Sequence, residues 1–434
     1  MCSRPARKPR AGQVHFLSLG CDKNLVDTEK FLACFKAAGF EPKLGGGRGD
    51  IIFINTCAFI DAAKEESIEH ILDAVRQKKA GRLKLIIVGG CLVELNRREL
   101  EKELPEVDLW LSFSEIERLL TGAPAWQRFR TTPRHISYLK IAEGCNRGCS
   151  FCIIPKIRGR FRSAPEAKLL AEARLLEASG VKELNLVAQD LCAYGKDTGT
   201  NLEQLLERLL SQTSIPWFRL FYLNPEGITT GLLKLMAREK RICRYIDFPF
   251  QHISDRVLKN MGRRVREKQI RSLIDKMRAI IPGLAIRGTA LVGFPGESET
   301  DFRRLARFVE DAHFDWLGVF AYSPQQDTRA FGMKGRVPTA TAARRKEQLE
   351  NLWRVWAEEK LRSRIDKKVK IIVDSKSDRE FDYQGRSQAS AYEIDGVIQL
   401  RGKFRPGEFC TVRIEDCLGL DLLGVKINAR RSVK

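Results

Sequence analysis

The chain has 434 residues, 43% of them hydrophobic and 30% charged, a length and balance that predict a globular protein of about three domains. No secretory signal follows the basic first residues and no apolar run could span a bilayer, so a secreted or membrane protein is not expected and a cytoplasmic location is. Lys and Arg (76) outnumber Asp and Glu (55), and the net charge of +21 favours either proximity to RNA or a basic surface without specific meaning.

The first predicted domain spans residues 12–127 and alternates strand with helix. This alternation is typical of a parallel sheet with crossover helices. The predicted strands lie at 13–20, 50–56 and 83–90, and the helices that follow them lie at 26–38, 62–79 and 93–104.

One cysteine comes directly after each of these predicted strands: Cys21, Cys57 and Cys91. The carboxyl ends of parallel strands lie along one edge of a sheet, so the three thiols are expected to converge there. A single buried cysteine is more often inert, but the shared position indicates ligands of an iron–sulfur cluster. In a reducing compartment, 12 cysteines also favour metal or redox chemistry over disulfides.

A second predicted domain, residues 131–363, follows a predicted linker at 121–133. Six βα units in this domain predict an incomplete barrel with its functional loops at the carboxyl ends of the strands. The predicted strands lie at 136–142, 183–188, 217–222, 245–248, 285–292 and 316–321, with helices at 166–179, 201–211, 266–281 and 299–311.

The loop after the first of these strands carries Cys145, Cys149 and Cys152, spaced Cys-x3-Cys-x2-Cys. A structural zinc site takes four ligands, and ferredoxin-type clusters take four thiolates. Three thiols would therefore leave one iron of a four-iron cluster open to another ligand. Three free cysteines, or half of a zinc site completed elsewhere, are the alternatives.

The third predicted domain spans residues 366–434. Its predicted strands, at 369–374, 397–400, 409–414 and 422–427, are separated by glycines, as in a small barrel of the oligonucleotide-binding kind. The expected fold class is therefore α/β, with an N-terminal parallel-sheet domain, an incomplete (βα)6 barrel and a small C-terminal β-barrel.

The cysteine loop at 143–162, with Phe151 before its third cysteine, resembles the signature of radical S-adenosylmethionine (SAM) enzymes. The resemblance implies a 4Fe–4S cluster whose open iron binds SAM and whose electron cleaves it to a 5′-deoxyadenosyl radical. The turn G-F-P-G-E-S at 293–298 resembles the SAM cradle of that family, with Ser298 where Thr is usual. The implied SAM-binding residues are Phe151, Gln189, Gly293, Pro295 and Gly296.

Three N-terminal segments, 20–29, 55–68 and 88–92, resemble the N-terminal domain of the methylthiotransferases, and the third domain resembles their TRAM domain. The likeness implies that the cysteines of these segments hold a second 4Fe–4S cluster, at which the sulfur to be inserted is assembled. Arg158, Arg160 and Arg162 alternate after the cysteine loop and would share one face if this segment is extended. They would then either neutralise a carboxylate or a phosphate near the open iron or be solvated at the surface without a specific role.

Within the methylthiotransferases, segments 20–24, 246–254 and 385–396 resemble the RimO type, which methylthiolates the β-carbon of an aspartate of ribosomal protein S-twelve. The likeness implies that protein as the partner, free, on the ribosome or on an assembly intermediate. A tRNA adenosine methylthiotransferase is the alternative, favoured by the net charge and disfavoured by segment 385–396. A zinc-containing RNA-binding protein without enzyme activity is the lower alternative. The electron donor, the sulfur source and the oligomeric state are not identified by the sequence.

Overall fold

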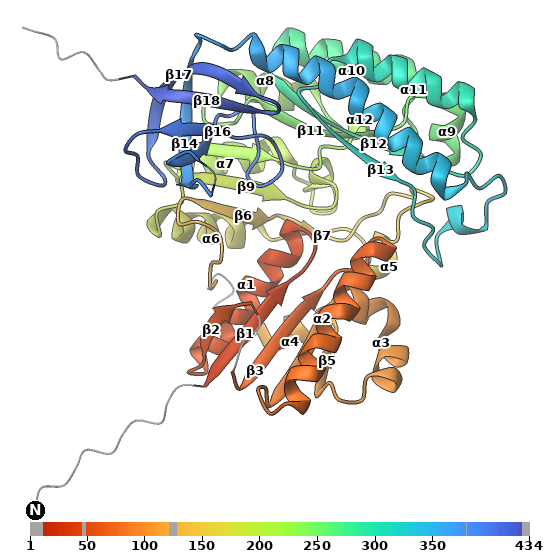
Figure 1. Ribbon diagram of the computed structural model, residues 1–434, viewed down its shortest axis with the longest axis vertical. Coiled ribbons are helices and arrows are strands. Elements are labelled where there is room, and N and C mark those ends of the chain that lie inside the picture. The colour runs from red at the N-terminus through yellow and green to blue at the C-terminus, as the bar shows by residue number, and fades with distance from the viewer. Residues whose placement is uncertain (1–11, 46–48, 121–127, 379, 428–434) are drawn as a thin grey trace, which may run out of the picture. The chain divides into compact units, whose positions relative to one another are not determined.

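The computed structural model describes residues 12–45, 49–120, 128–378 and 380–427 (Figure 1). The chain forms two compact units, Met1–Thr131 with Ile153–Gly159, and Thr132–Cys152 with Arg160–Lys434. The segment Ile153–Gly159 therefore packs with the first unit, although it directly follows Cys152 in sequence. The three predicted domains are a finer division and stay a prediction. None of the described helices is long and apolar enough to cross a bilayer.

The first unit is built on a five-stranded parallel sheet of order β2-β1-β3-β4-β5 (Figure 1). The three predicted strands are confirmed as β1, β3 and β4; the short edge strands β2 and β5 were missed because they span too few residues to show a period. The bounds are β1 Gln13–Ser18, β2 Glu41–Leu44, β3 Ile51–Thr56, β4 Leu85–Gly90 and β5 Leu109–Leu111, and α1 Asp22–Ala37, α2 Asp61–Lys79, α3 Cys91–Glu103, α4 Phe113–Leu120 and α5 Ile154–Arg158.

Both faces of this sheet are covered. Every residue of β3 is buried, and its side chains alternate between two cores. Ile52 and Ile54 pack into the core that also holds Ile157 of α5, while Phe53 packs into the core on the other face with Phe16 and Phe31. The helix α5 is thus an integral part of the first unit.

The end of the predicted linker is tied to this unit. Glu29 of α1 is fully buried, and its carboxylate accepts hydrogen bonds from Arg128 Nε (3.0 Å) and from Thr131 N (2.7 Å). The Phe129 amide donates to the Glu29 carbonyl at 2.9 Å. Residues 128–131 of the predicted linker therefore pack on the first unit, which ends at Thr131, and form no helix or strand; residues 121–127 lie outside the described part of the chain.

The second unit contains six parallel strands in two hydrogen-bonded groups, β10-β9-β6 and β11-β12-β13. An isolated bridge between Phe218 and Ile242 connects the groups. The six predicted strands of the incomplete barrel are confirmed, and helices α8 and α9 are additions to the prediction. The strands are β6 Ile136–Lys140, β9 Glu183–Val187, β10 Trp217–Leu220, β11 Tyr245–Gln251, β12 Ala285–Val292 and β13 Trp316–Ala321, with the short pair β7 Ala142–Glu143 and β8 Arg162–Ser163. The helices are α6 Glu166–Ala178, α7 Leu202–Gln212, α8 Thr230–Arg238, α9 Asp255–Asn260, α10 Glu267–Ile280, α11 Glu299–Ala312 and α12 Thr339–Arg362, with 3-10 turns η1 Leu191–Ala193, η2 Pro225–Gly227 and η3 Arg329–Gly332.

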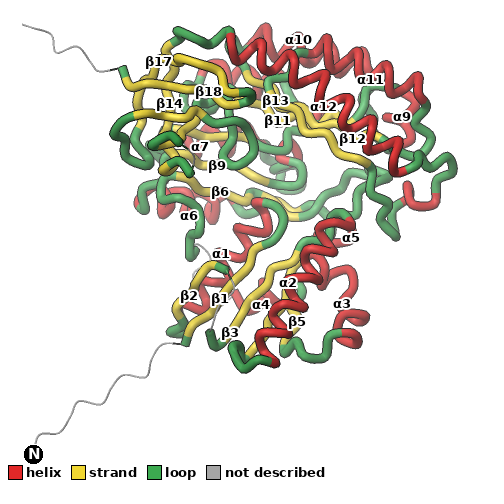
Figure 2. The backbone as a smooth tube through the Cα atoms, viewed as in Figure 1, coloured by secondary structure: helices red, strands yellow, loops and turns green. Residues whose placement is uncertain are grey.

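The second unit ends in a closed barrel of order β14-β15-β16-β18-β17 (Figure 2). The four predicted strands are confirmed, and β15 was missed because Gly385 suggested a break between strands. Gly385 instead lies inside β15, where a Cβ atom would lie 2.5 Å from the Ile372 carbonyl oxygen. The bounds are β14 Lys368–Lys376, β15 Tyr383–Arg386, β16 Ile398–Arg401, β17 Phe409–Leu418 and β18 Asp421–Lys426.

A buried ionic network attaches this small barrel to the six-stranded one. Arg386 of β15 is fully buried and donates to Glu183 Oε2, at the start of β9, and to Asp374 Oδ2, each at 2.7 Å. Arg219 of β10 also donates to Glu183 at 2.7 Å. The segment after Arg386 continues along the same end: Trp316 Nε1, at the start of β13, donates to the Ala389 carbonyl at 2.6 Å. The small barrel therefore closes the amino ends of the strands, the end opposite the cysteine loop.

This network makes the stability of the second unit sensitive to acid. Burial would raise the pKa of Glu183, but the charges of Arg386 and Arg219 outweigh burial and lower the pKa to about 2. A carboxyl whose pKa is lower in the folded than in the unfolded chain, where it is about 4.3, stabilises the fold above that value. This stabilisation is lost as the pH falls toward 2.

We therefore expect the difference in unfolding free energy between the unmodified chain and Glu183→Gln to be largest near neutral pH and to shrink between about pH 4.5 and pH 2. Urea unfolding at a series of pH values measures it. The control is Glu207→Gln, because Glu207 is exposed and its pair with Arg238 is solvated. A gap that stays constant down to pH 2 would contradict the prediction.

Candidate functional site

The three N-terminal cysteines lie at one edge of the first sheet. Cys57 directly follows β3, and Cys91 directly follows β4 as the first residue of α3, as predicted. Cys21 does not follow β1 directly, because Leu19 and Gly20 intervene; it is the N-cap residue of α1. Two of the three thiols thus lie at helix amino termini, where the helix dipole favours a thiolate.

These thiols are close enough to affect one another's charge. Burial raises the pKa of Cys91 to about 11, the Arg158 guanidinium opposes this rise, and negative charge on Cys57 or Cys21 would raise the pKa further. Burial also raises the pKa of Cys57. At Gly20, with φ +87°, a Cβ atom would lie 2.8 Å from Cys57 Sγ, so the glycine lets the backbone pass against this sulfur.

Asn24 organises the backbone beside these cysteines. Its Nδ2 donates to the carbonyls of Leu19 (3.0 Å) and Thr56 (2.9 Å), the residues before two of the cysteine turns. The Cys91 thiol lies 3.6 Å from Asn24 Oδ1. Asn24 thereby connects the ends of β1 and β3 to the start of α3. Asn24 lies in the segment that resembles the methylthiotransferases, but no local pattern predicts this role for it.

Arg158 reaches the same place from α5. Its Nη2 lies 3.8 Å from Cys91 Sγ and also donates to Asn24 Oδ1, and its Nη1 donates to Asp27 Oδ2 at 2.7 Å. The prediction that Arg158 shares a face with Arg160 and Arg162 near the other cysteines is wrong. Residues 154–158 form a helix and not an extended strand, so Arg158 is buried in the first unit while Arg160 and Arg162 are exposed.

The second set of cysteines, in the second unit, lies in the loop after β6 and β7, as predicted. Ser150 fixes the middle of this loop. Its amide donates to the Met261 carbonyl (2.9 Å), its hydroxyl to the Asn260 carbonyl (2.8 Å), and its own carbonyl accepts from the Ala330 amide (2.8 Å). The loop is therefore held by the end of α9 and by η3.

N–H donors contact two of these three thiols. Arg263 Nη1 lies 3.6 Å from Cys149 Sγ, and the Arg147 amide lies 3.4 Å from Cys145 Sγ. The Arg147 side chain pairs with Asp190 after β9 (2.6 Å) and with Glu226 after β10 (2.7 Å), which ties three strand-end loops together. Burial raises the pKa of Cys145, and the N–H donor opposes the rise.

Two of the residues expected to contact SAM lie at these strand ends. Phe151 packs edge-on against Phe294 of the glycine turn, with ring centroids 6.5 Å apart. Gln189 lies two residues after the end of β9, and its Nε2 donates to Glu143 at 3.1 Å. Gln189 Oε1 is buried and has no hydrogen-bond partner among the described residues. A buried oxygen without a hydrogen-bond donor is expected where a bound polar ligand would supply the donor.

The glycine turn follows β12 as predicted, but its amides are already used. The amides of Gly293 (2.7 Å) and Phe294 (3.2 Å) donate to the Glu297 carboxylate, and the Gly296 amide donates to the Gly335 carbonyl at 2.7 Å. Any contact between this turn and SAM must therefore come from carbonyls or from close backbone approach at Gly293, Pro295 and Gly296.

Ser298 ends the turn as the N-cap of α11, with its Oγ accepting from the Asp301 amide at 3.2 Å. Serine and threonine cap helices alike, so the departure from the family's threonine preserves the local structure.

The donor sets suit clusters better than single ions. No three His, Cys, Asp or Glu side chains of the described residues converge on a point that one metal ion could occupy. The thiolates of a four-iron cluster each bind a different iron and need no such convergence. Soft thiolates, held partly buried beside N–H donors, fit an iron–sulfur cluster in each of the two cysteine sets.

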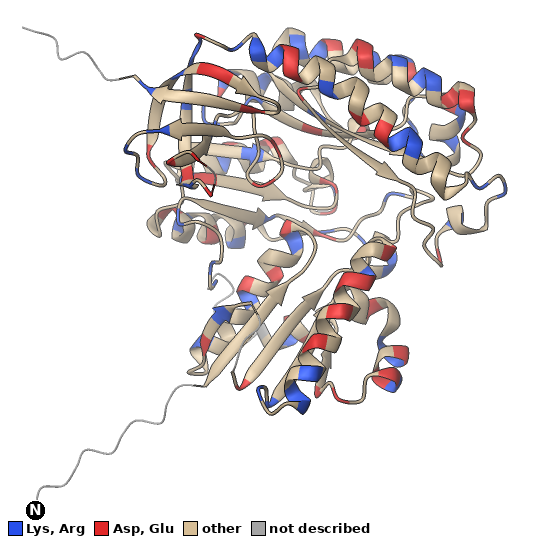
Figure 3. Cartoon of the chain, viewed as in Figure 1, with Lys and Arg blue, Asp and Glu red and all other residues tan. Residues whose placement is uncertain are grey.

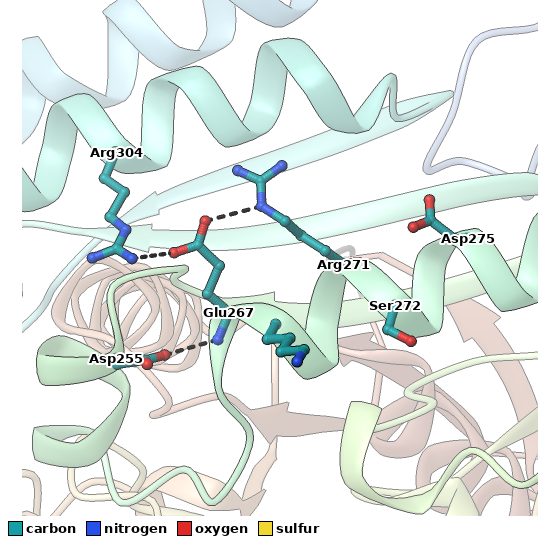
Figure 4. A pocket seen from close by; sticks show the side chains of 7 residues that line it. Asp255, Glu267, Arg271, Ser272, Asp275 and Arg304 are labelled. Atoms are coloured by element: carbon teal, nitrogen blue, oxygen red, sulfur yellow. Dashed lines mark hydrogen bonds and ion pairs between the residues drawn. The ribbon is translucent and has the colours of Figure 1, made fainter.

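An open hollow on the second unit contains none of the predicted site residues (Figure 4). Both of its arginines are already paired: Glu267 accepts from Arg271 at 2.9 Å and pairs with Arg304 at 2.6 Å. The Glu267 amide donates to Asp255 Oδ1 at 2.8 Å. We therefore take the strand-end loops, and not this hollow, as the candidate site.

Three sequence families match consecutive parts of the chain. Residues 13–112 match the uncharacterized protein family UPF0004, residues 139–309 match the radical SAM superfamily and residues 365–427 match the TRAM domain.

Among proteins of known structure, the fold resembles the radical SAM methyltransferase TsrM of Kitasatospora setae, whose structure holds cobalamin and a [4Fe-4S] cluster. The TM-score is 0.53 at 13% identity, over 78% of this chain and 85% of that chain. This likeness supports the fold alone. The expected α/β fold class is confirmed.

The sequence relatives extend over almost the whole chain. This chain is 41% identical to the ribosomal protein uS12 methylthiotransferase RimO of Geotalea uraniireducens, over 95% of this chain and 98% of that protein. It is 40% identical to the protein of the same name in Citrifermentans bemidjiense, again over 95% and 98%. The chain belongs to the RimO family of ribosomal protein uS12 methylthiotransferases.

Proposed function

We propose that the chain inserts a methylthio group at the β-carbon of an aspartate of ribosomal protein uS12, using SAM and two 4Fe–4S clusters. The observation that carries the proposal is the pair of three-cysteine sets, each at strand carboxyl ends, in a chain of the RimO family. When bound, the cluster of the second unit supplies the radical chemistry that opens a carbon–hydrogen bond, and the cluster of the first unit supplies the sulfur.

Residues of the second unit would hold one 4Fe–4S cluster and orient SAM beside it. Cys145, Cys149 and Cys152 would bind three irons as thiolates, and the contact from Arg263 to Cys149 favours the charged sulfur. Phe151, Gln189 and the turn at Gly293, Pro295 and Gly296 would position SAM. The free acceptor of Gln189 supports this role, because SAM carries an ammonium group that can donate to it.

In the first unit, Cys21, Cys57 and Cys91 would bind the second cluster and leave one iron for the sulfur. A side chain at Gly20 would collide with Cys57 Sγ, so the glycine leaves this sulfur accessible on that side. Arg158 supplies an N–H donor that would hold the Cys91 thiolate in place, and Asn24 fixes the backbone before Cys21 and Cys57 through the Leu19 and Thr56 carbonyls.

The relatives' names support uS12 as the substrate. Segment 385–396, which resembles the RimO type, has a structural role in this unit. Arg386, Ala389 and Asp395 bind the amino ends of strands, for example through the Tyr245 hydroxyl to Asp395 at 2.7 Å. In this unit the segment attaches the small barrel and lies away from the strand ends that carry the cysteines.

The net charge supports proximity to RNA, as on a ribosome or an assembly intermediate in the cytoplasm. The basic and acidic residues of α10, α11 and α12 are interspersed (Figure 3), and several are paired, such as Arg271 with Glu267 and Arg303 with Glu299. The two terminal stretches outside the described residues are basic without any Asp or Glu, and contain Arg4, Arg7, Lys8, Arg10, Arg430, Arg431 and Lys434.

The test is mass spectrometry of uS12 from a strain that lacks the gene, complemented with the unmodified chain or with Cys149→Ala. We expect the mass of one methylthio group on an aspartate of uS12 with the unmodified chain alone. Nucleosides of tRNA from the same cells are the second readout. Unmodified uS12 together with a change in a 2-methylthio nucleoside would overturn the proposal in favour of a tRNA enzyme.

A further inference from the structure

We infer that Arg158 is a positioning residue for the Cys21, Cys57 and Cys91 set, and that its positive charge raises the reduction potential of the cluster held there. The inference rests on the proposed function, because it needs a cluster in this set. It goes further by giving a role to a residue outside the cysteines, on a segment that follows the other cysteine loop in sequence.

The contacts of Arg158 fix its charge beside the sulfur. Its Nη2 lies 3.8 Å from Cys91 Sγ, and its side chain is 2% exposed. The guanidinium stacks on the Phe113 ring, 3.5 Å from the ring centroid. Its Nη2 and Nη1 groups donate hydrogen bonds to Asn24 Oδ1 and Asp27 Oδ2, respectively. The arginine therefore has little freedom to move its charge away from Cys91.

The backbone of α5 supports this placement. Pro155 lies in the first turn of the helix, and Gly159, with φ +71°, ends it directly after Arg158. Ile153 and Ile157 pack into the core of the first unit with Cys57 and Cys91. The buried isoleucines anchor the segment, so the position of Arg158 is set by apolar packing as well as by its ionic contacts.

A fixed cation at a thiolate ligand has a direct electrostatic consequence. Reduction adds negative charge to a cluster, and both positive charge and hydrogen bonds to its sulfurs stabilise the reduced form. Burial weakens screening by water and salt, so the effect is larger here than at the surface. Asp27, 2.7 Å from Arg158 Nη1, offsets part of the charge. Removing Arg158 and removing Asp27 should therefore change the potential in opposite directions.

The test uses the full chain with Cys145→Ala, Cys149→Ala and Cys152→Ala, so that only the N-terminal set can hold a cluster. After anaerobic reconstitution, iron content and a redox titration followed by electron paramagnetic resonance give cluster occupancy and midpoint potential. Relative to this parent, Arg158→Gln should shift the potential to more negative values, Arg158→Lys should shift it less, and Asp27→Asn should shift it to more positive values. The control is Arg160→Gln, which removes an exposed charge two positions away and should leave the potential unchanged.

Each outcome separates this inference from the proposed function. If the parent with Arg158 intact binds no cluster, the proposed function fails. If the parent binds a cluster and its potential is the same in Arg158→Gln and Asp27→Asn, the inference is overturned while the proposed function stands. If Arg158→Gln binds no cluster, the direction of the shift in Asp27→Asn decides, and a shift to more negative values or no shift overturns the inference.

Discussion

Replacing Arg386 with methionine is expected to lower the free energy of unfolding of the second unit by about 3–5 kcal/mol, because it leaves buried charges uncompensated. Glu183 and Asp374 both lose a partner at 2.7 Å, and both carboxylates are buried. Glu183 keeps Arg219, and Asp374 keeps His135 at 3.2 Å, so the loss is large but not total.

Urea unfolding followed by tryptophan emission measures this loss. Trp217 of β10 packs edge-on against Phe409 of β17, with centroids 4.9 Å apart, so its emission reports on the joint between the two barrels. The control is Arg413→Met, in the same small barrel, because Arg413 is 46% exposed and its pairs with Asp366 and Glu415 are solvated. We expect less than about 1 kcal/mol there. Equal losses in the two variants would show that the buried network does not hold the joint.

The positions of the cysteines could be predicted because their signals are local. β3 and β4 are continuous apolar runs, and Cys57 and Cys91 directly follow them, so finding the strands also locates the thiols. The strand-end rule for parallel sheets then brings the thiols to one edge without any knowledge of distant contacts. The same rule identified the loop of Cys145 and the turn after β12.

Arg158 lies in a helix, although its alternation with Arg160 and Arg162 predicts an extended segment. The sequence contained a contrary signal: Pro155 and Gly159 bracket one helical turn, and Ile153 and Ile157 are four residues apart. Which unit that turn joins is decided by the packing of the two isoleucines against the first sheet. That packing depends on residues far away in sequence and has no local mark.

The contacts of segment 385–396 could not be predicted from sequence patterns either. Its likeness to one branch of the methylthiotransferases indicates the type of enzyme and says nothing of its contacts, which join Arg386 to Glu183, separated by 203 positions along the chain. A lone arginine in a strand predicts exposure. Burial follows only once two carboxylates from other strands surround it.

The two cysteine sets should fail in different ways. Cys149→Ala is expected to abolish both 5′-deoxyadenosine formation and methylthiolation of uS12, because the second unit then lacks one of its three thiolates. Cys57→Ala is expected to keep 5′-deoxyadenosine formation within about an order of magnitude and to abolish methylthiolation, because its change lies in the first unit. Cleavage of SAM and insertion of sulfur would thus depend on different residues.

Anaerobic single-turnover assays, with chromatography for 5′-deoxyadenosine and mass spectrometry for the uS12 peptide, measure both products on one sample. Cys34→Ala is the matched control: this cysteine lies in α1 of the first unit, outside both sets, with its thiol directed to the Lys30 carbonyl at 3.9 Å. It should leave both products unchanged. Methylthiolation by Cys57→Ala at the rate of the unmodified chain would show that the N-terminal set does not supply the sulfur, since a site that has lost one of its three thiolate ligands cannot hold its cluster as before.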